Sequence, residues 1–355
     1  MPAPAGISPQ RILVLRLSAI GDLVLATPLF SGLRKRFPQA VIDVAVKEEF
    51  CELIRHHPAV NSVYTVRKHA GLRGLLHLGL DLRRRKYDVV LDLHRNFRTL
   101  LLGLMCGTQH RFGYHKHRLR RWFYVRFKCS TMAGIPPVRQ RYLQAAAPLG
   151  VQDDDTSTEI YWTSQHEQEA ERVLLAAGWR HGQNMIGLAP GAGFFTKRWP
   201  LEYFAELAGC LLREDGASAV AVLGGGQDCG LAQVLRQQNR ERVLDLTGKC
   251  SLLASAAIVK RCQLLVANDS GLMHIAEAVR TPVLAIFGST TRPLGFFPQL
   301  ASSRVIENQR VKCRPCSHLG YRACPLGHFH CMREILPPQV FGKIQEIKTG
   351  MPLYC

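Results

Sequence analysis

Asp22 lies where a carboxylate could act as a general base. It belongs to the segment LSAIGDLVLATP, in which an apolar strand pattern ends at Ser18 and an apolar helical pattern begins. Open α/β folds bind ligands at the carboxyl edge of a parallel sheet, so a carboxylate at this turn could take a proton from a substrate. The same residue could instead only complement the dipole of the helix that it opens. The local pattern leaves both interpretations open.

The segment PGAGFFTKRWP, residues 190–200, has the composition of a diphosphate site. Its glycines lie between a strand pattern and a helix pattern, where backbone N–H groups can face an anion, and Lys197 and Arg198 add positive charge. Trp199 and Pro200 could also be no more than residues that start a helix. The chain has neither a GxxxxGK[ST] phosphate loop nor a GxGxxG dinucleotide fingerprint at its first strand. The sequence therefore excludes these two common nucleotide-binding motifs.

A second turn of this kind occurs in NDSGLMHIAEA, residues 268–278. Ser270 and Gly271 follow Asp269 at the start of a helix pattern and can offer backbone amides to a phosphate. His274 comes about one helical turn later, which brings it to the same side of the helix. A lone histidine usually has no role, but its place just beyond such a turn favours a functional one.

Four late cysteines form the pattern C-x₂-C-x₇-C-x₆-C at Cys313, Cys316, Cys324 and Cys331. Four thiolates could hold a structural zinc ion, although this spacing is not that of a standard pair of CxxC knuckles. The other cysteines of the chain are scattered. Their distribution argues against a secreted disulfide scaffold and favours reduced thiols.

Parallel strands are needed to position these turns. Short apolar runs alternate with helical patterns before the acidic stretch 153–155, and the alternation begins afresh after it. The runs are 11–17, 40–46, 87–93, 185–189, 217–223, 243–246, 264–267 and 283–287. Such alternation predicts an α/β protein with two doubly wound parallel sheets. A length of 355 residues also indicates two domains.

The positive charge is concentrated in the first half of the chain. Residues 1–150 hold 25 Lys or Arg against 8 Asp or Glu, whereas residues 151–355 hold 21 against 19, so +17 of the net +19 lies before residue 151. A field of this kind attracts an anionic partner. Apolar runs such as 23–30 are far shorter than the roughly 18 residues of a membrane span, and no secretory signal is visible. We therefore expect a cytoplasmic protein.

Taken together and in order, three segments resemble the bacterial lipopolysaccharide heptosyltransferases of glycosyltransferase family 9. They are RLSAIGDLVLATP, PGAGFFTKRWPLEYFAELA and LTGKCSLLASAAIVKRCQLLVANDSGLMHIAEAVRTPVLAIFG, and the resemblance covers nearly the whole chain. It implies a GT-B fold, in which two Rossmann-like domains face each other across a cleft. The expected parts are an acceptor domain (1–165), a nucleotide-sugar donor domain (166–336) and a C-terminal helix within 337–355 that packs back toward the first domain.

The same resemblance implies an inverting, metal-independent transfer of heptose from ADP-heptose, without a cofactor. Asp22 matches the family's general base, and Lys197 matches the lysine that neutralises the departing diphosphate. The other positions that match the donor site are Thr247, Gly248, Asp269, Ser270, Gly271 and His274. Relatives often place an acid near the turn that here reads GGGQDCG, and some have Glu where this chain has Gly230. Asp228 is the nearby carboxylate that we expect at the ribose.

The basic first half would suit an anionic acceptor. Arg95, Arg98 and Arg120 are expected to bind phosphates and acidic sugars of the lipopolysaccharide core, with the enzyme attached peripherally to the inner face of the membrane. A merely solvated basic surface is the alternative for each cluster. Two other functions stay open: a GT-B enzyme acting on another nucleotide sugar, such as an epimerase, and a nucleic-acid-binding protein with a zinc module. No nucleic-acid motif is recognisable and aromatics make up only 8% of residues, so nucleic acid is not an expected partner.

Overall fold

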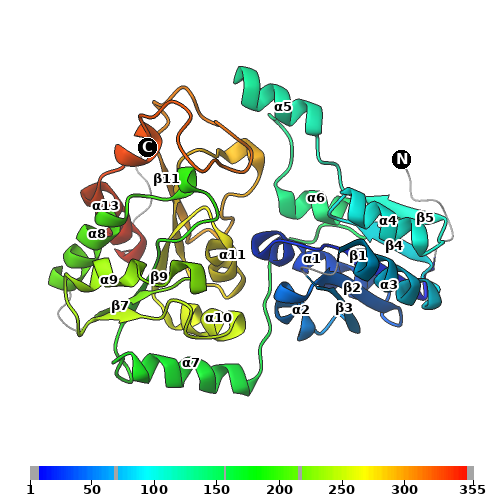
Figure 1. Ribbon diagram of the computed structural model, residues 1–355, viewed down its shortest axis with the longest axis horizontal. Helices are drawn as coiled ribbons and strands as arrows, with labels where there is room; N and C mark the ends of the chain where they lie inside the picture. The colour runs from blue at the N-terminus through cyan, green and yellow to red at the C-terminus, as the bar shows by residue number, and fades with distance from the viewer. Residues whose placement is uncertain (1–7, 68–70, 156, 215–217, 350–355) are drawn as a thin grey trace. The chain divides into compact units, whose positions relative to one another are not determined.

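The computed structural model describes residues 8–67, 71–155, 157–214 and 218–349. The chain divides into two compact units, each with its own parallel sheet and covering helices (Figure 1). The first unit comprises Met1–His117 and Pro136–Tyr161, and the second comprises Arg118–Ile135 and Trp162–Cys355. Segment 118–135, which the sequence assigned to the first domain, thus groups with the second unit.

The first unit is built on a five-stranded sheet with the order β3-β2-β1-β4-β5, and every strand pair in it is parallel. Its strands are β1 (Arg11–Leu15), β2 (Val41–Lys47), β3 (Ser62–Val66), β4 (Val89–Asp92) and β5 (His110–Gly113). Its helices are α1 (Ile20–Arg36), α2 (Glu52–Arg55), α3 (Gly71–Arg84), α4 (Phe97–Met105) and α6 (Val138–Gln144). The central strand β1 reads RILVL and buries four consecutive side chains, as a strand covered on both faces must.

The second unit has a six-stranded parallel sheet with the order β11-β10-β9-β6-β7-β8. Its strands are β6 (Met185–Ala189), β7 (Ala219–Val222), β8 (Val243–Asp245), β9 (Leu264–Asn268), β10 (Val283–Phe287) and β11 (Arg304–Glu307). Its helices are α5 (Arg118–Phe127), α7 (Ser164–Ala176), α8 (Leu201–Glu214), α9 (Leu231–Arg236), α10 (Leu252–Arg261), α11 (Gly271–Ala278), α12 (His330–Arg333) and α13 (Pro337–Thr349).

The last helix, α13, packs within the second unit. Val340 and Ile344 are fully buried in the core that also holds Trp199 and Phe204, and α13 contacts α8 and β11. These contacts lie within the second unit, and the expectation that this helix packs back toward the first domain stays a prediction. Its apolar side chains are buried in the core of the second unit, where α13 packs on α8.

Three strands went unforeseen in the sequence, namely β3, β5 and β11, and each lies at an edge of its sheet. An edge strand is covered less completely, so it has no continuous apolar run. In β5 the sequence is HRFG, and none of its residues is buried. Among the described residues, no helix has both the length and the apolar character needed to cross a bilayer.

Candidate active site

Asp22 lies in the first turn of α1, and both of its carboxylate oxygens are bonded. Nη2 of Arg16 lies 2.5 Å from Oδ2, and the hydroxyl of Tyr142 donates to Oδ1 at 2.7 Å. The backbone N–H of Ala19 also donates to Oδ2, at 3.5 Å. The side chain nevertheless keeps 21% of its surface exposed. It is therefore held in one orientation while it stays open to a reactant.

The segment after β1 and helix α6 supply the partners of Asp22. Arg16 follows β1, and its Nη1 donates to the carbonyl of Leu93, which follows the neighbouring strand β4, at 2.6 Å. Tyr142 comes from α6, which packs against α1. Its buried ring lies 5.4 Å from the Arg16 guanidinium and meets the Tyr114 ring edge-on at 4.8 Å. The guanidinium is thus fixed by a carbonyl, a carboxylate and an aromatic ring.

These contacts set the charge of Asp22. Burial by itself would raise the pKa of this carboxyl, but the Arg16 charge and the hydrogen bonds from Tyr142, Arg16 and Ala19 outweigh it. The result is a pKa below the ordinary value of an aspartate. Asp22 is therefore ionised at neutral pH, the state that a general base requires.

The loop after β4 carries the basic residues expected to bind the acceptor. The N–H groups of His94 and Arg95 donate to Oδ1 of Asp92 at 2.9 and 2.7 Å, and Nη1 of Arg95 donates to the carbonyl of Tyr114 at 3.3 Å. Arg98 is exposed on the first turn of α4. Burial and the charge of Arg16 lower the pKa of His94 to about 4, so its ring is neutral at pH 7.

Arg120 belongs to a different unit from that loop. It belongs to α5 of the second unit, whereas Arg95 and Arg98 belong to the first. Sequence reasoning grouped the three residues because all of them precede residue 150. Long-range contacts, not position along the chain, decide which unit a segment joins.

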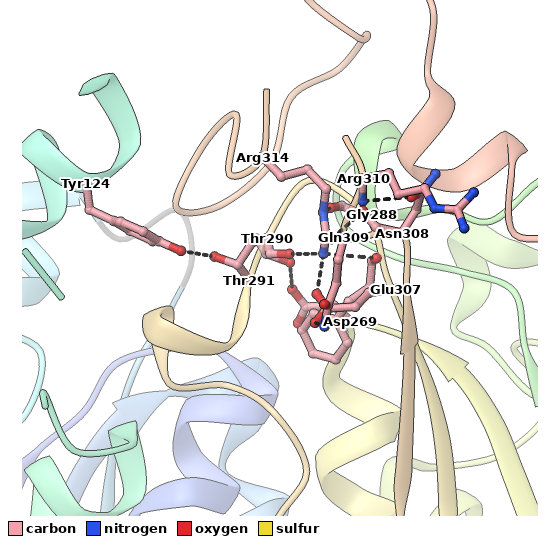
Figure 2. A network of polar contacts seen from close by, with 11 residues as sticks. Tyr124, Asp269, Gly288, Thr290, Thr291, Glu307, Asn308, Gln309, Arg310 and Arg314 are labelled. Carbon is pink, nitrogen blue, oxygen red and sulfur yellow. Dashed lines mark hydrogen bonds and ion pairs between the residues drawn. The ribbon is translucent and has the colours of Figure 1, made fainter. Parts of the chain in front are cut away.

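Lys197 and Asp269 form an ion pair in the second unit. Nζ of Lys197 lies 2.7 Å from Oδ2 of Asp269. The hydroxyl of Thr290 donates to the same oxygen at 2.7 Å (Figure 2). Lys197 follows β6, Asp269 follows β9 and Thr290 follows β10. These three strands are adjacent in the sheet, so their carboxyl ends bring the three side chains to one edge.

Helix α11 begins at this edge. Ser270 is its N-cap residue, and the Ser270 hydroxyl oxygen is buried with no hydrogen-bond partner among the described residues. His274 is buried one turn further, with its ring 6.4 Å from that of Phe296. A helix start, an unused hydroxyl and the Lys197 ammonium together form a site that can hold a phosphate.

The turns after β6, β7 and β8 also meet. The N–H of Gly225 donates to Oδ2 of Asp228 at 3.0 Å, and a Cβ on Gly191 would lie 2.5 Å from Oδ1 of this carboxylate. The N–H of Gly248 donates to the carbonyl of Gly224 at 3.0 Å, and Gly248 has a φ of +65°, which favours glycine. The carboxylate of Asp228 therefore bonds to the glycine turn after β7 and lies close to the glycine turn after β6.

Thr247 completes this group of turns. Its hydroxyl donates to Oδ1 of Asp245 at 2.7 Å, and its backbone N–H donates to the same oxygen at 3.1 Å.

Burial raises the pKa of Asp228, against the opposing effects of the Gly225 hydrogen bond and the Arg198 charge. The structure thus brings Asp228, Thr247 and Gly248 to neighbouring strand ends, and their contacts with a nucleotide remain predictions.

Arg314 is a buried residue that sequence reasoning missed. Its guanidinium donates to three backbone carbonyls, those of Gly288, of Asn308 at 2.8 Å and of Thr290 at 3.0 Å (Figure 2). Its Nη2 also lies 2.5 Å from Oε2 of Glu307. These bonds hold the loop after β10 in the position from which Thr290 reaches Asp269. Nothing local to Arg314 marks it, whereas the turn GSTT directly after a strand could have drawn attention to Thr290.

The late cysteines lie near one another in the second unit. Sγ of Cys313 lies 4.0 Å from Sγ of Cys316 and 3.8 Å from Nε2 of His328, while Cys331 is buried in the core. In the part of the chain that the structure describes, no group of three or more His, Cys, Asp and Glu side chains is arranged to hold a metal ion. The zinc site that the spacing allowed, with Cys324 as a fourth ligand, stays a prediction that these side-chain positions do not support.

Comparison with known proteins identifies the family. Residues 75–326 match the model of glycosyltransferase family 9 (heptosyltransferase). Lipopolysaccharide heptosyltransferase 2 of Salmonella typhimurium is 29% identical over 310 residues, which span 84% of this chain and 88% of that relative. Lipooligosaccharide heptosyltransferase 2 of Haemophilus influenzae is 27% identical, over 95% of this chain and 99% of the relative.

The solved structures agree on the fold. The structure of E. coli ADP-heptose lipopolysaccharide heptosyltransferase II superposes with a TM-score of 0.74 and 23% identity, over 96% of this chain and 99% of that one. The expected fold class, GT-B with two parallel-sheet α/β domains, is therefore confirmed. Because the family model matches residues 75–326, which are most of the chain, this chain is an enzyme that belongs to glycosyltransferase family 9, the heptosyltransferases.

Proposed function

We propose that this enzyme transfers heptose from ADP-heptose to the inner core of lipopolysaccharide, with inversion at the anomeric carbon. The observation that carries the proposal is the family match over residues 75–326, in a chain whose relatives are named lipopolysaccharide and lipooligosaccharide heptosyltransferases. The donor is the nucleotide sugar named for the E. coli enzyme of the same fold. No cofactor is required for such a displacement.

Asp22 is the general base in this mechanism. The acceptor hydroxyl attacks the anomeric carbon, its proton passes to a carboxylate oxygen of Asp22, and the bond from that carbon to the ADP oxygen breaks on the opposite face. The bonds from Arg16 and Tyr142 support this role because they keep the carboxylate ionised and oriented. Inversion follows from attack opposite the leaving group.

Lys197 and the start of α11 stabilise the leaving ADP. Negative charge grows on the diphosphate as the bond breaks, and an ammonium and helix-end N–H groups fixed beforehand lower the energy of that state. Asp269 holds Lys197 at 2.7 Å and is itself held by Thr290. Ser270, Gly271 and His274 complete the phosphate side of the donor site, with Thr247 and Gly248 beside the adenine and Asp228 at the ribose.

The acceptor is anionic, and basic side chains bind it. Arg95 and Arg98, on the loop and helix after β4, contact its phosphates and acidic sugars, and Arg120 contributes from α5. Because this acceptor is a glycolipid, the enzyme works attached peripherally to the inner face of the membrane. This attachment needs no spanning segment.

Replacement of the base tests the proposal. Asp22→Asn should lower kcat by about 10²- to 10⁴-fold, because the amide cannot take the proton, while the affinity for ADP-heptose stays nearly unchanged. Product formation would be followed by mass spectrometry of the core acceptor after incubation with ADP-heptose. Asp81→Asn, at a half-buried carboxylate on α3, serves as the matched control. Retention of more than about a tenth of the wild-type turnover would contradict the assignment of Asp22.

A further inference from the structure

Helix α5, of sequence RLRRWFYVRF, buries none of its side chains. Leu119, Trp122, Phe123 and Phe127 are between 44% and 76% exposed. Trp122, Phe123 and Phe127 contact one another, with ring centroids 5.0 to 5.8 Å apart. A helix of a globular protein usually packs its apolar side chains into the core. On α5 they form an aromatic cluster at the surface instead.

The loop that follows Cys316 adds apolar side chains to this surface. Leu319, Tyr321 and Leu326 are 43% to 64% exposed. This loop and α5 together line an open cavity of about 1050 Å³, which Trp122, Leu319 and Leu326 border. We call these seven residues, four on α5 and three on the loop, the α5 surface. Contiguous exposed apolar side chains of this kind mark an interaction site.

The charge around the α5 surface has one sign. Residues 118–128 contain five cations, Arg118, Arg120, Arg121, Arg126 and Lys128, and no acid. The chain has no Asp or Glu between Asp92 and Asp153. These cations favour an anionic partner for the α5 surface, and the exposed aromatic side chains favour an apolar one.

Polar contacts hold α5 in place while its aromatic side chains stay outside. The hydroxyls of Tyr124 and Thr291 are 2.7 Å apart (Figure 2), and Nζ of Lys128 donates to the carbonyl of Pro315 at 2.5 Å. The hydroxyl of Thr131 donates to the carbonyl of Arg120 at 2.7 Å, which secures the chain after the helix. The helix is thus fixed to the second unit by its polar groups and not by burial of its apolar ones.

We infer that the α5 surface docks on an anionic lipid bilayer. Helices with arginines beside tryptophan, phenylalanine and leucine lie in the interface between headgroups and acyl chains, and their cations bind acidic headgroups. Both features occur here on one helix and its neighbouring loop. The inference rests on the proposed function, because an acceptor anchored in a bilayer brings this enzyme to that surface, and it adds the residues that bind the lipid.

Co-sedimentation of the full-length protein with vesicles tests this inference. We expect binding to vesicles that contain phosphatidylglycerol and little binding to pure phosphatidylcholine. The double variant Trp122→Ser/Phe127→Ser and, independently, Leu326→Ser should weaken binding to the anionic vesicles, the double variant by about tenfold or more. Arg118→Glu/Arg126→Glu should weaken it by about tenfold and reduce its salt dependence.

Matched controls lie in the same unit. Leu175→Ser/Leu336→Ser removes exposed apolar side chains elsewhere, and Arg172→Glu/Arg180→Glu reverses exposed charges elsewhere. Both controls should bind like the wild type. Equal losses in control and α5 variants, equal binding to both lipid compositions, or unchanged binding by all α5 variants would each overturn the inference. A wild-type protein that ignores vesicles but binds a nucleic-acid duplex would overturn it too.

Turnover separates this inference from the proposed function. With a deacylated, water-soluble core acceptor, Trp122→Ser/Phe127→Ser should turn over like the wild type, because its substitutions lie on the lipid-binding surface. With acceptor embedded in anionic vesicles, the same variant should be slower. If the wild type transferred no heptose to the soluble acceptor, the proposed function would fail, whereas the vesicle result would still decide the role of the α5 surface.

Discussion

Removal of a single hydroxyl from Tyr142 should change the pH dependence of the reaction. This hydroxyl donates to Oδ1 of Asp22 at 2.7 Å, and the ring is fully buried. In Tyr142→Phe the ring, its packing on Tyr114 and its contact with Arg16 all remain. The substitution therefore withdraws one hydrogen bond from the carboxylate and little else.

The size of the effect follows from the bond that is lost. A hydrogen bond to a charged group contributes about 1.5 to 3 kcal/mol, and one pKa unit corresponds to about 1.4 kcal/mol. The hydrogen bond stabilises the ionised form, so its loss raises the pKa of Asp22, by roughly one to two units. Arg16 remains 2.5 Å away and keeps most of the depression in place.

The assay is the pH profile of kcat/KM, which reports the ionisation of the free enzyme. In the wild type the depressed pKa keeps Asp22 ionised down to pH values below the ordinary range of an aspartate. In Tyr142→Phe the acidic limb should move up by about one to two pH units, while the rate near pH 8 changes little. Folding stability at neutral pH should also fall, and this difference from the wild type should disappear as the pH falls through the depressed pKa of Asp22 in the folded wild-type protein.

Tyr114→Phe is the matched control. It removes a hydroxyl from the ring that packs against Tyr142, and that hydroxyl makes no hydrogen bond to Asp22 among the described residues. Its acidic limb should stay in place. If Tyr142→Phe lowered the rate equally at every pH and left the limb unmoved, Asp22 would not be the titrating base.

Four further predictions concern other parts of the molecule. Thr290→Val removes a 2.7 Å bond to Asp269 and should raise the KM for ADP-heptose about tenfold without changing that for the acceptor, as steady-state kinetics would show. Arg314→Met leaves a carboxylate and several carbonyls without their donor and should lower the free energy of unfolding by about 3 to 5 kcal/mol, measurable by denaturant titration. Arg95→Glu/Arg98→Glu should raise the acceptor KM more than about tenfold and weaken its salt dependence, and an unchanged KM would move acceptor recognition elsewhere. Activity should survive EDTA, because an ammonium and helix-end amides balance the diphosphate charge, and restoration of lost activity by Mg²⁺ would contradict this.

Much of the fold was predictable from short stretches of sequence. The central strands β1, β6, β9 and β10 are continuous apolar runs, and a run of this kind is a local property of a strand covered on both faces. Edge strands such as β5 lack it and were missed. The places of Asp22, Lys197 and Asp269 were predictable for a similar reason, since each follows a recognisable strand within a few residues.

The contacts of these residues depended on the tertiary structure. Lys197 meets Asp269 because β6 and β9 are neighbours in a sheet whose strand order no local pattern shows. Tyr142 reaches Asp22 across 120 residues of sequence because α6 packs on α1. Segment 118–135 likewise joins the second unit through contacts with residues far away in the chain. The sequence by itself indicated which turns could carry chemistry, whereas packing between distant segments decided which side chains meet, because a contact exists only after both of its partners are folded.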